Sequence, residues 1–234
     1  MMRMRRSLGL GPPEPPVSPA HMEELLRPFL PQPLQVSQLA ALATYLGLLL
    51  RWNARLNLTA VREANNIVTR HMGESLFAAA YLLNGNGHTG RAIDLGSGAG
   101  FPGLPFKIYA PHLRVTLIES QHKKATFLRE VVRALQLTDV EVFAGRGENF
   151  GGRGQLVVLR AVEHFEQALP IAASLLDSSS EGPFPAPVPP RLGLLIGAAQ
   201  AERARALLPQ FRWEAPIAIP LSASRILLVG ATAA

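Results

Sequence analysis

The first part of the chain spaces its apolar residues as helices do. Over residues 39–50 leucines and alanines recur at steps of three and four, which places them on one face of an amphipathic helix. A short helix is expected before it, over residues 21–30, and a longer one after it, over residues 65–83. Ser37 is a candidate N-cap for the middle helix. The pattern therefore predicts an N-terminal helical lobe over residues 21–85.

From residue 91 onward, short apolar runs alternate with amphipathic stretches. This alternation is typical of an α/β fold in which a doubly wound, mostly parallel sheet has helices on both faces. The last two runs have no helix between them, so we expect an antiparallel hairpin at one edge of a seven-stranded sheet. The predicted strands are 91–95, 114–119, 140–144, 155–160, 191–197, 211–219 and 225–230, and the predicted helices are 102–110, 121–136, 165–176 and 199–208.

Two segments are rich in residues that oppose regular structure. Residues 1–20 combine arginines with five prolines, and a disordered tail is expected there. Residues 178–190 are rich in serine, proline and glycine, and they predict a surface insertion. The sheet domain itself is expected to occupy residues 88–234.

Composition narrows the classes of protein to consider. Apolar residues make up 48% of the 234 residues, enough for a substantial core, and the absence of cysteine excludes disulfides and thiolate metal sites. The most apolar window, residues 39–50, is too short to cross a membrane, and no signal peptide is visible, so a cytoplasmic protein is expected. A net charge of +6, from 23 basic and 17 acidic residues, favours a polyanionic partner such as nucleic acid.

The most informative stretch is residues 92–103, Ala-Ile-Asp-Leu-Gly-Ser-Gly-Ala-Gly-Phe-Pro-Gly. An apolar run is followed by Gly96, Gly98 and Gly100, which predicts a strand, a glycine turn and a helix that together cradle a nucleotide-like ligand. A dinucleotide-binding loop requires a glycine at its sixth position, where this chain has Phe101. The spacing instead resembles motif I of class I S-adenosylmethionine (SAM) methyltransferases. A loop for NAD or FAD and an ordinary glycine-rich turn are the alternatives.

Ligands of a doubly wound sheet bind at the carboxyl ends of its strands, and here these ends are polar or charged. Glu119 ends the second predicted strand, where it either accepts both ribose hydroxyls of an adenosyl group or is an exposed acid. Asp94 must be hydrogen-bonded if it is buried, and it either holds the glycine loop or reaches an amino group of the ligand through water. Arg160 ends the fourth strand and needs an anion: a cofactor carboxylate, an RNA phosphate, or the carboxylate of Glu163 or Glu166.

The turn after the third predicted strand, residues 145–148, is a further candidate. There Glu148 or a neighbouring amide faces an adenine, or Arg146 and Glu148 form a surface pair. No metal site is expected, because His71 has no second histidine at ligand spacing, and an ordinary hydrogen-bonded helix histidine is the default interpretation. Ser97 lies outside any nucleophile-elbow pattern, so a Ser-His-Asp triad is not supported.

Several stretches together resemble the glucose-inhibited division protein B family. Residues 52–61 contain Trp-Asn and then Asn-Leu-Thr, and residues 70–76 contain a histidine before Glu-Ser-Leu, where the family usually has Asp-Ser-Leu. The likeness continues in three further places: the glycine loop with Phe-Pro-Gly, the pairs Glu-Ser and Lys-Lys at 119–124, and Arg-Ala at the end of the fourth strand. The resemblance covers about residues 35–176 and again 225–230.

The chain departs from the family pattern at three places. Leu159 stands where a serine usually precedes Arg160, Glu74 replaces an aspartate, and Ile196-Gly197 stands where lysine-glycine often follows the fifth strand. The last change puts a contact to RNA or phosphate in doubt at that position, and leaves the cofactor site unaffected.

The resemblance implies a class I SAM-dependent methyltransferase fold with an N-terminal helical extension. It also implies transfer of a methyl group from SAM to N7 of a guanine in 16S ribosomal RNA, either free or within the 30S subunit, by a cytoplasmic and monomeric enzyme. By position, the expected cofactor contacts are Asp94, Gly96, Gly98, Phe101, Glu119, Gly147, Glu148 and Arg160.

Guanine N7 has an exposed lone pair and no proton, so in-line transfer needs no general base, and no catalytic base is assigned. The rate would come from holding nucleophile and methyl group in line. Carboxylates such as Glu119 and Glu148 would offset positive charge growing on the base, and Phe101 or Phe165 is a candidate to stack on it. The basic side chains expected to bind RNA are Arg51, Arg55, Arg62, Arg70, Lys123 and Arg129.

Two other functions remain open from the sequence. One is a SAM methyltransferase that acts on a protein or a small molecule, which the basic charge and the Trp-Asn…Asn-Leu-Thr stretch disfavour. The other is a non-catalytic RNA-binding protein with a relic SAM pocket. A relic pocket predicts damage in the glycine loop, and the loop is intact.

Overall fold

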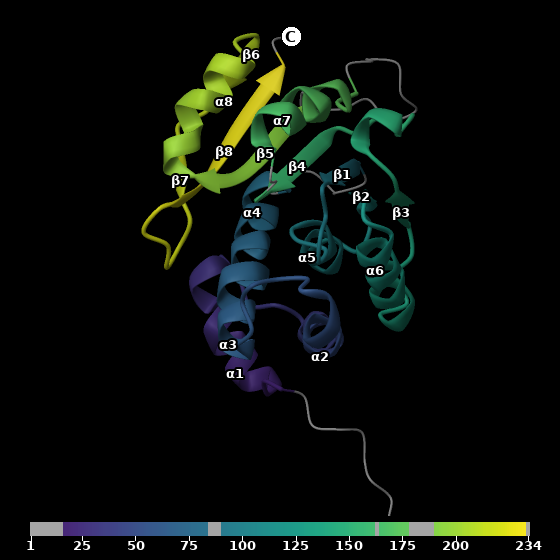
Figure 1. Cartoon of the computed structure of the whole chain (residues 1–234). Helices are drawn as coiled ribbons and strands as arrows, with labels where there is room; N and C mark the ends of the chain where they lie inside the picture. Colours follow the sequence, from purple (N-terminus) through teal and green to yellow (C-terminus); the bar gives the residue numbers. More distant parts are fainter. Residues whose placement is uncertain (1–15, 84–89, 162–163, 178–189, 233–234) are drawn as a thin grey trace, which may run out of the picture.

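The computed structural model of the chain describes residues 16–83, 90–161, 164–177 and 190–232. A sheet forms the centre of the molecule, and helices lie on both of its faces (Figure 1). The strands are β1 (Arg91–Leu95), β2 (Arg114–Glu119), β3 (Val140–Ala144), β4 (Leu156–Arg160), β5 (Arg191–Gly197), β6 (Phe211–Trp213), β7 (Ile217–Ala218) and β8 (Arg225–Thr232). Their order is β3-β2-β1-β4-β5-β8-β6, with β7 also paired to β8.

The pairing confirms the predicted doubly wound, mostly parallel sheet. Strands β1 to β5 are parallel to their neighbours, whereas β8 is antiparallel to β5, β6 and β7. One predicted strand, 211–219, is divided into β6 and β7. Pro216 lies in the gap and has no N–H to donate to a sheet ladder, so the described part of the sheet has eight strands instead of seven.

The helices agree with the predicted ones to within a few residues. The predicted helix 65–83 is continuous but contains a π-helical turn, η2, between α3 and α4. The helices are α1 (Pro19–Leu26), α2 (Val36–Leu56), α3 (Ala64–Ile67), η2 (Val68–Gly73), α4 (Glu74–Leu82), α5 (Gly103–Tyr109), α6 (His122–Ala134), α7 (Phe165–Ser174) and α8 (Ala201–Leu207). Short 3₁₀ turns are η1 (Arg27–Phe29), η3 (Gly147–Asn149) and η4 (Ala198–Gln200).

The beginning of the lobe differs from expectation in two details. Ser37 does not cap α2, because the helix already begins at Val36, and Gln35 is its N-cap. The Gln35 backbone N–H donates to the Gln38 side chain at 2.8 Å, so the residue three positions into the helix satisfies the amide of the N-cap. Ordered structure also starts before residue 21, since Ser18 caps α1. The rest of the predicted tail, residues 1–15, lies outside the described residues, as do positions 178–189 of the predicted insertion.

Two apolar clusters cover the two faces of the sheet. Alternation along β4 sends Leu156 and Val158 to one cluster and Val157 and Leu159 to the other. The first cluster also contains the buried side chains of α1, α2, α4, α5 and α6, and the second contains those of α7 and α8. The helical lobe therefore shares one continuous core with a face of the sheet. Whether residues 21–85 and 88–234 act as separate units stays a prediction.

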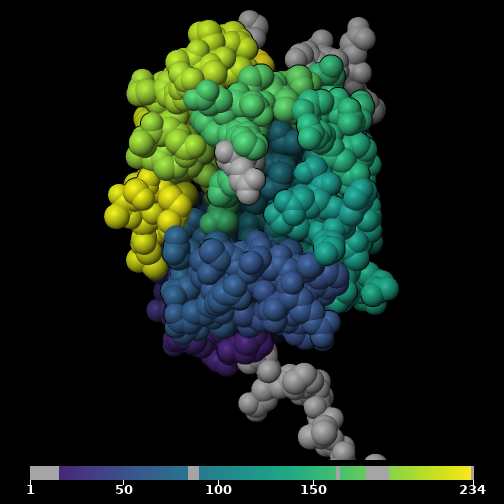
Figure 2. Space-filling model, in the orientation of Figure 1, coloured from purple at the N-terminus to yellow at the C-terminus, as the bar shows by residue number. Residues whose placement is uncertain are grey.

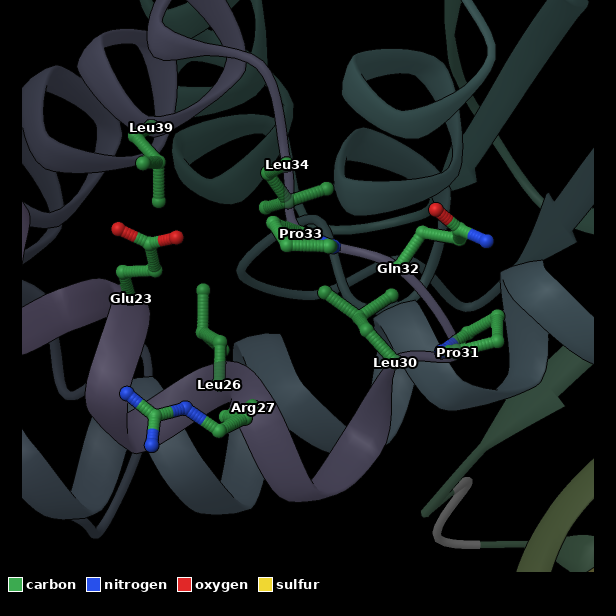
Figure 3. Close-up of a pocket in the computed structure, with 9 residues that line it drawn as sticks. All are labelled: Glu23, Leu26, Arg27, Leu30, Pro31, Gln32, Pro33, Leu34 and Leu39. Carbon is green, nitrogen blue, oxygen red and sulfur yellow. The ribbon is translucent and has the colours of Figure 1, made fainter.

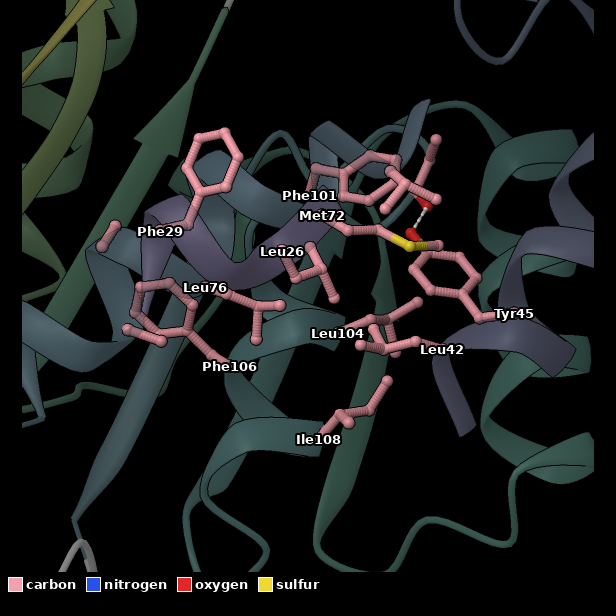
Figure 4. Close-up of a cluster of buried hydrophobic side chains, with 14 of the residues drawn as sticks. Leu26, Phe29, Leu42, Tyr45, Met72, Leu76, Phe101, Leu104, Phe106 and Ile108 are labelled. Carbon is pink, nitrogen blue, oxygen red and sulfur yellow. Dashed lines mark hydrogen bonds between the residues drawn. The ribbon is translucent and has the colours of Figure 1, made fainter. Parts of the chain in front are cut away.

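Figure 4 shows this shared core at the point where the lobe meets the glycine loop. Tyr45 of α2 lies beside Phe101, with ring centroids 5.3 Å apart. The buried Tyr45 hydroxyl donates to the Ala99 carbonyl. This bond ties the longest helix of the lobe directly to the loop that carries the strongest chemical signal in the sequence.

Candidate functional site

The loop after β1 has a backbone that only glycine adopts readily. Gly96, Gly98 and Gly100 have φ values of 74°, 56° and 95°, all in the left-handed region. A Cβ on Gly100 would also lie 2.3 Å from Leu104 Cδ1 and 2.9 Å from the Tyr45 hydroxyl. Backbone conformation therefore favours glycine at all three positions, and close packing also requires it at Gly100. The turn brings its backbone to the carboxyl end of the sheet.

Glu119, at the end of β2, closes the loop. Its Oε2 accepts from the Gly98 N–H at 2.9 Å, and its Oε1 accepts from the Gln121 N–H at 2.7 Å. A carboxylate oxygen can accept two hydrogen bonds, so each oxygen of this buried side chain keeps an acceptor position. Two adjacent hydroxyl donors, such as those of a ribose, match this arrangement.

Asp94 lies beneath the loop and is buried. Its Oδ2 accepts from the Gly103 N–H at 2.9 Å, whereas its Oδ1 has no partner among the described residues. Burial raises the pKa of this carboxyl to about 7, although the Gly103 bond acts in the opposite direction. Asp94 therefore holds the start of α5 and keeps one unmatched acceptor next to the site.

A cavity of about 330 Å³ opens at the loop. Figure 2 shows the surface hollowed between the blue helical lobe and the teal and green surface of the sheet domain. The cavity is lined by Leu58, Thr59, His71, Gly96, Ser97, Gly98, Ala99, Phe101, Glu119, Ser120, Gln121, Lys124, Arg160, Ala161 and His164. The structure thus brings five predicted cofactor residues together: Gly96, Gly98, Phe101, Glu119 and Arg160.

Arg160 makes contacts that the sequence did not suggest. Its Nη2 donates to the Arg70 carbonyl at 2.7 Å, to His71 Nδ1 at 2.9 Å and to Glu74 Oε2 at 3.2 Å. Arg225, at the start of β8, donates from Nε to the other oxygen of Glu74 at 2.8 Å. Glu74 is buried with only 1% of its surface exposed, so these two guanidinium groups compensate its charge.

Of the anions expected for Arg160, only Glu166 is shown to be wrong. Glu166 pairs with Arg203 at 2.7 Å on the exposed surface, and Glu163 lies outside the described residues. Burial lowers the pKa of Arg160, and the Glu74 carboxylate counteracts this effect. A partner 86 residues earlier in the chain gives no local signal, although Glu74 stands within a stretch that carries the family resemblance.

His71 is more than an ordinary helix histidine. Its ring lies 5.0 Å from the Phe101 ring, and its Nε2 lies 2.6 Å from Thr59 Oγ1. Burial, and then the positive charge of Arg160, lower its pKa to about 3, so the ring is neutral at physiological pH. Thr59 and His71 were missed as site residues, yet both belong to stretches that the family resemblance singles out.

The remaining candidates lie outside the cavity. Gly147 is buried, and a Cβ there would lie 2.6 Å from Leu95 Cδ1 and 2.9 Å from Ile171, while Glu148 is exposed. Their proposed contact with an adenine stays a prediction. Phe165 is buried and does not line the cavity. The basic residues expected to bind RNA are all exposed, on the lobe and on α6: Arg51, Arg55, Arg62, Arg70, Lys123 and Arg129.

Other features of the described chain offer less chemistry. A smaller pocket of about 160 Å³ between α1 and the start of α2 is lined mainly by leucines and prolines (Figure 3). Within the described ranges, no cluster of histidine and acidic residues is suited to a metal ion. Nor does any helix described there have the length and apolar character needed to cross a membrane.

Comparison with solved structures supports the fold. The chain is similar to magnesium protoporphyrin IX methyltransferase from Synechocystis, whose structure contains SAM, with a TM-score of 0.60 and 14% identity over 81% of this chain and 97% of that one. It is also similar to a predicted O-methyltransferase from Agrobacterium tumefaciens, with a TM-score of 0.55 and 20% identity over 68% and 81% of the two chains. These likenesses show the class I SAM methyltransferase fold.

Sequence comparison is more specific. The family described as rRNA small subunit methyltransferase G matches residues 38–182. Proteins named ribosomal RNA small subunit methyltransferase G from Roseiflexus castenholzii and Xylella fastidiosa are 45% and 50% identical over 148 and 107 residues. These matches cover 62% and 46% of this chain, and 58% and 48% of the relatives, so the chain spans about half the length of the curated relatives it matches. The family match includes more than half of the present sequence, and the chain belongs to the rRNA small subunit methyltransferase G family.

Proposed function

We propose that this chain transfers a methyl group from SAM to N7 of a guanine in 16S ribosomal RNA. The observation that carries the proposal is one cavity with two kinds of wall. One wall is the glycine loop with Glu119, and the other contains Thr59 and His71 from the two lobe stretches that resemble the family. Relatives that bear the name ribosomal RNA small subunit methyltransferase G support the substrate class.

The residues present fit SAM. Glu119 keeps an acceptor position on each oxygen for the ribose hydroxyls, and the glycine loop lets backbone approach the methionine part. The unmatched Oδ1 of Asp94 is an acceptor beneath the same loop. When bound, SAM supplies a methyl group on a positively charged sulfur, which a lone pair can attack directly.

The side chains around the cavity position groups and move no proton. Guanine N7 carries no hydrogen, so a general base has no task at that atom. His71, whose pKa is about 3, is a poor base at neutral pH and is held by Thr59 and Arg160. The acceleration then comes from alignment of the reacting atoms.

The proposal extends to the partner and the place of action. Exposed basic side chains on the lobe and α6 bind RNA phosphates, in free 16S RNA or in the 30S subunit. The enzyme acts as a monomer in the cytoplasm. The net charge of +6 supports a polyanionic partner.

The decisive experiment compares 16S RNA from cells with and without this protein by mass mapping of methylated guanines. One N7-methylguanine should disappear and return on complementation. In vitro, tritium from labelled SAM should enter RNA, and calorimetry should detect SAM binding. Transfer of the label to protein or to a small molecule would contradict the proposal and indicate a methyltransferase with a different substrate. Absence of SAM binding would indicate a non-catalytic RNA-binding protein.

A further inference from the structure

In the His71 tautomer that the contact with Arg160 favours, no described residue accepts the proton of the Thr59 hydroxyl. Arg160 has only donors, so the nitrogen of His71 that faces it, Nδ1, must be the acceptor of their 2.9 Å hydrogen bond. The proton of the neutral ring is therefore on Nε2, and Nε2 donates to Thr59 Oγ1 at 2.6 Å. The Val61 N–H donates to the same oxygen at 3.1 Å. Both acceptor positions of Oγ1 are then occupied.

The position of this donor is fixed on both sides. The Thr59 backbone N–H donates to Oδ1 of the buried Asn53 at 2.9 Å, and His71 is itself held by Arg160. Thr59 lines the cavity, so its O–H is a preorganised neutral donor on the wall formed by the lobe. A donor held in this way recognises an acceptor on a bound molecule.

The proposed function determines which acceptor this is. The ribose and methionine parts of SAM belong to Glu119 and the glycine loop, and the wall with Thr59, His71 and Phe101 is left for the target base. On the edge of guanine that carries N7, the neighbouring group is the acceptor O6, whereas adenine has an N–H donor at that position. A donor next to the reacting nitrogen therefore accepts guanine and rejects adenine.

The Thr59 hydroxyl is uncharged, and this affects how reactive N7 of the guanine remains. A cation at O6 would withdraw electron density from N7 while positive charge grows on the ring. Arg160 also lines the cavity, but its guanidinium group donates to Glu74 and His71, and Thr59 offers an uncharged donor on the same wall. This arrangement selects the base with a smaller penalty to its nucleophilicity.

We propose that the Thr59 hydroxyl donates to O6 of the target guanine and thereby determines base specificity, with His71 as a positioning residue that orients this hydroxyl. The inference rests on the proposed function. It identifies a specificity-determining residue for that reaction.

The test is a double-mutant cycle between enzyme and RNA. The guanine identified by mass mapping is replaced with 2-aminopurine, which keeps N7 but lacks O6, in 16S RNA assembled into 30S subunits. The native enzyme should lose about tenfold to a hundredfold in kcat/KM on the 2-aminopurine substrate, the range expected for one directed hydrogen bond. Thr59→Val should lose a similar factor on guanine and discriminate less than about threefold between the two bases. Thr59→Ser should restore discrimination.

Controls separate the possible failures. Thr44→Val changes an exposed threonine whose hydroxyl only donates to the Ala40 carbonyl, and it should leave discrimination unchanged. SAM affinity by calorimetry reports whether Thr59→Val retains a folded cofactor site. If Thr59→Val weakens SAM binding but not base discrimination, the hydroxyl serves the cofactor and the inference is wrong. If the native enzyme methylates both bases equally, the inference also fails, whereas no methylation of unmodified guanine would refute the proposed function itself.

Discussion

The two walls of the cavity are assembled in different ways. The glycine-loop wall joins Asp94, Gly98, Gly103, Glu119 and Gln121, which lie close in sequence, through backbone N–H groups and carboxylates. The lobe wall depends on hydrogen bonds across 86, 89 and 151 residues of sequence, from the lobe to the starts or ends of two strands. The first wall is therefore a property of a local motif, and the second exists only when the whole chain has folded.

The largest expected effect tests the charge balance of the lobe wall. Glu74→Gln leaves Arg160 and Arg225 without their buried anion, and should lower the free energy of unfolding by about 3–5 kcal/mol. Urea denaturation measures this difference. Glu166→Gln is the matched control, because its pair with Arg203 is exposed and screened by water, so the free energy of unfolding should hardly change. Equal losses of unfolding free energy in both variants would mean that the buried ion pairs stabilise the fold no more than the exposed pair does.

The glycine-loop wall is tested by Glu119→Gln. An amide cannot accept at both positions, so its NH₂ group would face the N–H of Gly98 or Gln121, and ribose would lose an acceptor. SAM affinity measured by calorimetry should fall by about a hundredfold, the equivalent of about 2.7 kcal/mol. Glu141→Gln, an exposed acid on the neighbouring strand β3, should leave affinity within about twofold. An unchanged affinity in Glu119→Gln would remove this carboxylate from the cofactor site.

A pH titration of stability distinguishes one buried group in each wall. Asp94 has a pKa of about 7 in the folded protein, above its ordinary 3.8, so the folded state holds an extra proton and stability falls as pH rises to 7. His71 acts in the opposite direction: its folded pKa of about 3 lies below 6.5, so stability is lost as pH falls below 6.5.

Asp94→Asn should therefore remove a loss of about 2 kcal/mol between pH 5.5 and pH 7.5, leaving stability that rises with pH over the His71 range. Unfolding curves of both proteins across this interval give the difference directly. Parallel pH profiles would show that Asp94 is ionised throughout, with an ordinary pKa.

The smallest effect concerns the exposed basic residues outside the cavity. Arg129→Gln removes one exposed cation from α6 and should reduce the slope of log affinity for 16S RNA against log salt by about 0.7. Filter binding at several salt concentrations measures the slope. Arg203→Gln on α8, an element that contributes no residue to the cavity, is the control and should leave the slope unchanged. If the two variants behave alike, RNA does not approach over α6.

The contrast between the walls also explains what could be predicted from the sequence. The predictions of β1, β2, β4 and β5 match almost to the residue because buried parallel strands are short apolar runs, and the ends of β2 and β4 mark Glu119 and Arg160. The prediction of a single strand over residues 211–219 is less accurate, because Pro216 interrupts strand pairing without changing the apolar character of its neighbours.

The partners of Arg160 could not be found in this way. The sequence points to acids close by, at 163 and 166, whereas the fold supplies Glu74 from the lobe. His71 was interpreted as an ordinary helix histidine, since nothing local reveals that a ring will lie between Thr59 and Arg160. The family resemblance marked both stretches but not their contact with each other.

The position of β8 has a consequence for how this protein is synthesised. The strand lies between β5 and β6, and its first residue, Arg225, neutralises Glu74. A growing polypeptide therefore carries an unpaired β5 edge and a partly uncompensated acid until translation has passed residue 232. Only a chain translated through β8 therefore has a second neighbour for β5 and the contact between Arg225 and Glu74.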